Sequence, residues 1–324
     1  MASNFFQLQA ANRRRSWLLI AAVVVLLGAL GFAAGFGITG EPALGLGYTL
    51  AGIGFASFAA AGSYFQGDAL VLAASKARAV QPEAYPQLEN VVDELAIAAG
   101  VPRPRVYVID DTAPNAFATG RDPQHASVAI TTGLLEKLDR EELQGVMAHE
   151  LSHVRNFDIR FALLVGVLVG SIALLADFFL RFTFWGGGRR SNNDRGGSGG
   201  LQAIFFVVAI VLSILAPIAA RLVQLAVNRQ REYLADASSV QLTRNPYGIE
   251  RALAKISTDQ EVLEVANRAT QHMYFTNPIK KFEERASGLF STHPATLDRI
   301  NRLRQLTGDQ PLEGAEAAQL AGLD

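Results

Sequence analysis

The sequence DREELQGVMAHELSHV, residues 139–154, predicts a helix that carries a metal site. Acidic residues occupy its first turn, where the helix dipole favours negative charge, and apolar residues recur at helical spacing. His149 and His153 are four residues apart, so a helix projects both imidazoles from one face, where they can bind one zinc ion. Glu150 follows the first histidine and can act as general base on a zinc-bound water. The pattern is typical of zinc peptidases.

The composition of the chain limits the other possibilities. Half of its 324 residues are hydrophobic, which is unusual for a soluble protein. A formal net charge of −1 provides no basic field, so we expect no nucleic-acid partner. Because the chain has no cysteine, disulfides and thiolate ligands are excluded. A metal must therefore be bound by imidazole, carboxylate and water.

Four hydrophobic segments predict a multi-pass protein of the lipid bilayer. They span residues 17–39, 43–67, 161–180 and 201–220, and each is long enough as a helix to cross a hydrocarbon core of ~30 Å. The first is too long for the h-region of a cleavable signal peptide, so we expect a retained anchor. The third is interrupted by Asp177, for which we expect an interfacial ion pair with Arg181 at helical spacing.

Basic residues predict how the chain is oriented in the cell (inner) membrane. Arg13, Arg14 and Arg15 precede the first segment, which favours a cytoplasmic N-terminus. The turn at residues 40–42 has no basic residue and can lie outside, so the segment after the second crossing returns to the cytoplasm. We therefore expect the catalytic domain on the cytoplasmic side.

The domain organisation follows from these segments. We expect an N-terminal tail with a first hairpin at residues 1–67, and a second hydrophobic hairpin at 161–220. The catalytic domain is divided between residues 68–160 and 221–324. Since its two parts share one metal, the second hairpin crosses the membrane twice or not at all. Two crossings place the Gly-rich linker at 185–200 outside despite its arginines, so a re-entrant or cytoplasm-facing hairpin stays open as the alternative.

A zinc peptidase needs a third protein ligand, and the best candidate is Glu232. It lies in a helix predicted to continue from the last hydrophobic segment, with Asp236 one turn further on the same face. Asp236 could accept a hydrogen bond from the far nitrogen of a histidine ligand. The alternative is an ordinary charged pair of the helix surface, with Arg229 or Arg231 as ion-pair partners.

Two further elements are weaker on residue patterns alone. Residues 105–109, 115–119 and 127–131 favour β-structure and predict a small antiparallel sheet before the HExxH helix, whose role could be purely structural. His293 precedes Pro294 and a predicted helix, so by itself it is typical of a helix start. His125 and His272 are expected to be surface residues.

The order of motifs resembles the HtpX family of membrane-bound zinc metalloproteases, relatives of the CAAX-processing membrane proteases. HELSH at 149–153 is followed, after two hydrophobic segments, by EYLAD at 232–236. The resemblance extends upstream to NAFATG at 115–120 and downstream to STHPATLDRI at 291–300. It covers almost the whole chain. It implies a mainly α-helical membrane protein with a zincin-like, gluzincin catalytic domain.

The resemblance also implies a role for each matching residue. His149, His153 and Glu232 would bind one Zn²⁺ per chain, Glu150 would be the catalytic base, and Asp236 would support the ligands. His293 and Arg299 match an HPxxxxR element, which implies that they polarise the scissile carbonyl or hold Asp236 and Glu232. An edge strand would bind extended substrate by strand addition, through Asn115, Ala116, Phe117, Ala118 and Thr119.

The activity implied by the resemblance is hydrolysis of peptide bonds, by a Glu-activated zinc-bound water, in unfolded or damaged membrane proteins. This would serve quality control and the stress response on the cytoplasmic side. A protease acting within the bilayer is disfavoured, because polar residues flank the HExxH helix. The alternatives are CAAX-type processing, for which more hydrophobic segments are expected, and a non-enzymatic scaffold with structural zinc, which does not need Glu150.

Overall fold

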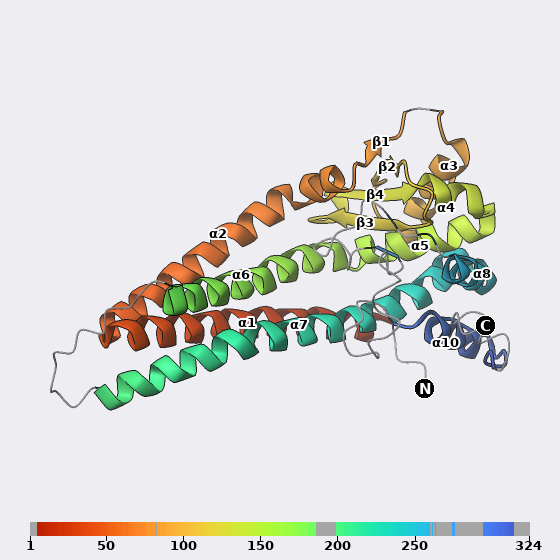
Figure 1. The fold of residues 1–324 in the computed structure, drawn as a ribbon. Helices are drawn as coiled ribbons and strands as arrows, with labels where there is room; N and C mark the ends of the chain where they lie inside the picture. Colours follow the sequence, from red (N-terminus) through yellow and green to blue (C-terminus); the bar gives the residue numbers. More distant parts are fainter. Residues whose placement is uncertain are drawn as a thin grey trace. The chain divides into compact units, whose positions relative to one another are not determined.

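The structure, a computed structural model, describes residues 5–81, 83–185, 199–259, 261, 263, 274–275 and 294–313 (Figure 1). It consists of two compact units. We call them the hydrophobic unit, Met1–Tyr64 with Leu163–Gln224, and the sheet unit, Phe65–Ala162 with Leu225–Asp324. The Gly-rich segment at 186–198 lies outside the described residues.

Long helices contain the four predicted hydrophobic segments. They are α1 (Phe5–Thr39), α2 (Pro42–Ala74), α6 (Asp158–Trp185) and α7 (Gly199–Thr243). Within the described residues, Gly200–Ala220 of α7 is long and apolar enough to cross a membrane, whereas Val24–Thr39 and Pro42–Phe58 are shorter apolar stretches. A mainly helical protein with a candidate membrane span is thus confirmed, and the multi-pass architecture stays a prediction.

In the hydrophobic unit, small residues let α1 and α2 approach closely. A Cβ atom at Gly35 would lie 2.9 Å from Cα of Gly45, so only glycine fits this contact. The α6 helix carries the expected ion pair, in which Arg181 Nε lies 2.7 Å from an Asp177 carboxylate oxygen, with both side chains exposed. The predicted pairing of these two charges is therefore confirmed.

The sheet unit contains a four-stranded sheet in the order β1-β2-β4-β3. Its strands are β1 (Arg78–Ala79), β2 (Arg105–Ile109), β3 (Ala116–Gly120) and β4 (Ala126–Thr131). The antiparallel prediction was wrong for one pair: β2 and β4 are parallel, with Val106 opposite Val128. The reason is topological. After β2 the chain forms β3 at the far edge of the sheet. It then turns through the short 3-10 helix η1 (Pro123–His125), and β4 lies between β2 and β3.

The predicted HExxH helix is confirmed as α5 (Arg140–Arg155). A capping box starts it: the Asp139 side chain accepts from Glu142 N, and the Glu142 side chain accepts from Asp139 N. Around α5 the sheet unit builds its core from β3, β4 and the helices α3 (Pro86–Ala99) and α8 (Pro246–Thr258), and α8 in turn contacts α10 (Thr296–Thr307). The short helix α4 (Thr132–Lys137) precedes α5.

We expect Gly145→Ala to destabilise the sheet unit, because α5 and α8 meet there at backbone distance. An added Cβ atom would lie 2.5 Å from Ile249 N, and overpacking of this kind costs roughly 1–3 kcal/mol. Thermal unfolding of the purified protein measures the loss. The control is Gly54→Ala, where an added Cβ would have no neighbour within 4 Å. Equal melting temperatures for Gly145→Ala and the parent would contradict the close contact.

Candidate metal centre

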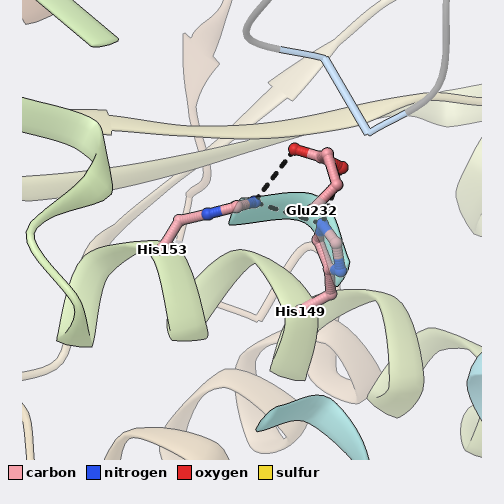
Figure 2. Close-up of side chains that lie close together, drawn as sticks. All are labelled: His149, His153 and Glu232. Atoms are coloured by element: carbon pink, nitrogen blue, oxygen red, sulfur yellow. Dashed lines mark hydrogen bonds and ion pairs between the residues drawn. The ribbon is translucent and has the colours of Figure 1, made fainter. Parts of the chain in front are cut away.

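Two helices bring the three predicted ligands together (Figure 2). The α5 helix supplies His149 and His153, and α7 supplies Glu232. The two Nε2 atoms are 3.2 Å apart. Glu232 Oε2 lies 3.4 Å from His149 Nε2, and Oε1 lies 3.5 Å from His153 Nε2. The candidate ligand atoms all lie within 4.8 Å of one another, so this group could hold a metal ion.

The carboxylate partners of the His149 and His153 rings lie at Nδ1. The two Nε2 atoms, which face each other, are therefore available to a metal. Nδ1 of His149 lies 2.9 Å from Asp236 Oδ1, and Nδ1 of His153 lies 3.1 Å from Asp158 Oδ2. A carboxylate at Nδ1 accepts the ring proton there, so Nε2 keeps its lone pair. Glu232 Oε2 is buried without a hydrogen-bond partner among the described residues. A metal bond would satisfy it, so the donor set fits a divalent metal.

Burial and mutual contact also shift the pKa values of these groups. Burial disfavours the charged form of His153, but its hydrogen bonds to Asp158 and Glu232 outweigh this and raise its pKa well above the usual value. The pKa of His149 is raised in the same way, against burial, by Asp236 and Glu232. Burial favours a neutral Glu232, yet its close contacts with the two histidines hold its pKa well below the usual range. Without a metal, these shifts favour a charged imidazole beside a charged Glu232 carboxylate.

Glu150 is placed where a general base could act. It follows His149 on α5, and only 2% of its surface is exposed. Burial raises its pKa, while the charges of His149 and His153 oppose that shift.

Arg299 from α10 is buried beside the candidate ligands. Its Nε and Nη2 atoms donate to the two carboxylate oxygens of Asp236 over 2.9 and 2.7 Å. Its Nη1 donates to the main-chain oxygen of Phe275 over 3.0 Å and lies 3.7 Å from Glu232 Oε2. Of the two roles that the resemblance left open, these contacts match the holding of Asp236 and Glu232.

The predicted edge strand lies at the edge of the sheet as β3, and part of its outer side is used by the chain itself. Phe117 forms an antiparallel bridge with Tyr274, and Phe275 N donates to Ala116 O over 2.7 Å. Asn115 lies just before the strand and is also buried. All residues of β3, including Ala118 and Thr119, are buried. Strand addition at β3 would therefore require its cover to open.

Of the remaining predicted histidines, the structure describes His125 alone. His293 and His272 lie outside the described residues. His125 is half exposed, and its Nδ1 lies 2.7 Å from Asp122, as suits a surface residue.

Sequence reasoning missed several residues that surround the candidate ligands. Asp158 contacts His153, and Arg231 lies 3.4 Å from Asp158. A signal existed for Asp158: it is the acidic residue that separates the HExxH helix from the next hydrophobic segment. Phe275, whose ring lies 4.9 Å from that of His149, had no comparable signal, because its position depends on chain distant in sequence.

A buried HExxH helix, with a carboxylate from another helix as the third candidate ligand, is the arrangement of a metallopeptidase site. The chain belongs to peptidase family M48, whose model matches residues 82–307. The predicted resemblance to the HtpX family is also confirmed. A "Protease HtpX homolog" of Caldanaerobacter subterraneus subsp. tengcongensis is 43% identical over 309 residues, which cover 93% of this chain and 98% of the relative. One from Streptococcus uberis is 43% identical over 301 residues, 93% of this chain and 99% of the relative.

Among solved structures, the chain is similar to the crystal structure of S. mikatae Ste24p. The TM-score is 0.48 at 16% sequence identity, and the match covers 92% of this chain and 67% of that chain.

We expect metal affinity to fall as the pH is lowered. Both histidines have raised pKa values in the metal-free chain. Below those values the metal must displace protons, whereas above them Nε2 is free, so apparent affinity is fully developed at high pH. It should weaken by up to about tenfold per pH unit for each proton released. Calorimetric Zn²⁺ titrations of metal-free protein from pH 6 to 8 measure affinity and proton release. A constant affinity without proton release would show that these contacts do not form.

Proposed function

We propose that the protein is a membrane-bound zinc metalloendopeptidase. The observation that carries this proposal is the convergence of His149, His153 and Glu232, beside a buried Glu150, in a chain of peptidase family M48. Two imidazoles and one carboxylate leave a position open for water and substrate, as in catalytic rather than structural zinc sites. A scaffold with structural zinc has no need for Glu150.

The chemistry divides between the metal and Glu150. When bound, zinc supplies a Lewis acid that makes water a stronger acid and the scissile carbonyl a better electrophile. Glu150 takes a proton from the attacking water and passes it to the leaving amine. Asp236 holds the His149 ring through Nδ1, so this ring keeps one tautomer while the proton moves. Arg299 keeps Asp236 ionised and in place.

An extended substrate would add to the outer side of β3 after Tyr274 and Phe275 leave it, and such a site would favour unfolded chains. Ala116 O accepts from Phe275 N, so it faces away from β4. Alternate residues of an antiparallel strand share this direction, so the N–H and C=O of Ala118 also face outward. Since strand addition requires extended backbone that folded proteins do not offer, the proposed substrates are unfolded or damaged membrane proteins.

The membrane location is supported by the apolar helices. Gly200–Ala220 can cross a bilayer, and many large apolar side chains of α2 and α7 are exposed, among them Phe55, Phe58, Val207 and Ile214. The proposed arrangement has two membrane hairpins, with the N-terminus and the catalytic domain on the cytoplasmic side of the inner membrane. Quality control and the stress response are the proposed physiological setting.

We expect Glu150→Gln to abolish cleavage while leaving the metal in place. The amide cannot accept the proton of water, and loss of a general base costs about 10²–10⁴-fold in rate. The assay uses protein purified without metal and reloaded with Zn²⁺, acting on an unstructured membrane protein. Glu141→Gln, an exposed change on the same helix, is the matched control.

A companion variant separates chemistry from metal binding. Glu232→Ala should lose both cleavage and stoichiometric zinc, whereas Glu261→Ala, at an exposed glutamate, should lose neither. Full-rate cleavage by Glu150→Gln would refute the mechanism, and undiminished zinc affinity in Glu232→Ala would remove that residue from the site.

Because the chain has no cysteine, single cysteines can report the topology. With a membrane-impermeant thiol reagent on intact cells, Glu41→Cys and Ser191→Cys should be labelled, whereas Lys76→Cys should react only after permeabilisation. Labelling of Ser191→Cys only after permeabilisation would reject two full crossings by the second hairpin.

A further inference from the structure

A second carboxylate–arginine pair lies behind the candidate ligands, on the side of His153. Asp158 Oδ2 is 3.1 Å from His153 Nδ1, and Asp158 Oδ1 is 3.4 Å from Arg231 Nε. Arg231 Nη1 also donates to the main-chain oxygen of Asp158 over 3.5 Å. The Arg231 guanidinium lies over the Phe161 ring, 3.4 Å from its centroid. The side chains of Asp158 and Arg231 are 7% and 6% exposed, so both charges are buried.

The backbone is built to place Asp158 there. The α5 helix ends at Arg155, and Phe157 has a φ of 60°, in the left-handed region that bulky side chains rarely adopt. Phe157 N donates to Val154 O, which closes the turn. Asp158, the first residue of α6, therefore lies beside the last turn of α5, where His153 lies. Unfavourable conformations of this kind cluster at functional sites.

The buried charges of Asp158 and Arg231 are tolerated because they form a pair. An isolated carboxylate or guanidinium is strongly disfavoured in the interior, so Arg231 and Asp158 compensate each other, and the Asp158 carboxylate faces Nδ1 of His153. On the other side of the cluster, Arg299 pairs with Asp236 and Asp236 contacts His149. Each histidine thus has its own carboxylate and its own arginine.

We propose that Asp158 and Arg231 are positioning residues of the metal centre: Asp158 fixes the tautomer and ring orientation of His153, and Arg231 holds Asp158. Arg231 directly precedes Glu232 on α7, so the pair also links the second ligand to the backbone that bears the third. This inference rests on the proposed metal-dependent function. Neither residue touches substrate; both act through His153.

The test compares Asp158→Asn with Asp259→Asn. The control also removes a carboxylate from a largely buried ion pair, 2.6 Å from Lys137 Nζ, away from the histidines. The readouts are the Zn²⁺ Kd by chelator competition, the visible spectrum of the Co²⁺-substituted protein, and kcat and KM for cleavage. Loss of an outer partner of a ligating histidine typically costs 10–100-fold in affinity or activity. We expect about that rise in Kd, an altered Co²⁺ spectrum and a lower kcat for Asp158→Asn, and parental values for Asp259→Asn.

A second variant keeps the test decisive if Asp158→Asn does not fold. Arg231→Gln leaves the Asp158–His153 contact available, so it should raise the Kd in the same direction but less. The double variant should be no worse than Asp158→Asn alone, because Arg231 acts through Asp158.

Parental Kd values and Co²⁺ spectra in folded variants would overturn the inference, whatever their stability, because the pair would then serve folding alone. A parent protein that binds no zinc would overturn both this inference and the proposed function. A parent that binds zinc but does not cleave would overturn the peptidase function only, and the comparison of Kd values would still decide the role of Asp158.

Discussion

The candidate site depends on burying charged groups without leaving any of them unpaired. Asp236 and Arg299 are almost completely buried, and an unpaired charge on either side chain would be strongly disfavoured in the interior. Joined by two hydrogen bonds, they present a carboxylate to Nδ1 of His149, which turns Nε2 of that ring toward His153 and Glu232. The same bonds join α10 to α7 and α7 to α5. The geometry of the candidate ligands therefore depends on the correct packing of these three helices.

The rest of the sheet unit holds α5 in place. The capping box between Asp139 and Glu142 begins the helix at a defined residue, and Lys255 from α8 lies 2.6 Å from the buried Glu142 carboxylate. Gly145 lets α8 approach α5 at backbone distance, and β3 contacts α5 from the sheet. Because two histidines must meet one ion within tenths of an ångström, a helix fixed at its start, its middle and its end suits this task.

The candidate ligand Glu232 and its neighbour Asp158 lie on helices that also contain apolar segments. The helix α6 begins three residues after α5 ends, and α7 contains both Gly200–Ala220 and Glu232. The outer side of β3 is partly occupied by Tyr274 and Phe275.

The sequence by itself determined the features that depend on local spacing. The four-residue separation of His149 and His153 places both on one helix face, and Glu232 and Asp236 follow the same rule. Hydrophobic length predicted the long helices, because an apolar run of that size has few other stable forms. The family resemblance added Arg299, which no local pattern would have placed beside Asp236.

Only the tertiary structure decided what depends on chain reversals and distant partners. The direction of β4 relative to β2 follows from how β3 crosses to the sheet edge, and strand patterns do not encode that path. The contact of Asp158 with His153 requires a left-handed residue at Phe157, which a sequence pattern does not reveal in an aromatic residue. Phe275 reaches His149 from far along the chain. Periodicity fixes which face a residue occupies, whereas the partner of that face is set by how the whole chain folds.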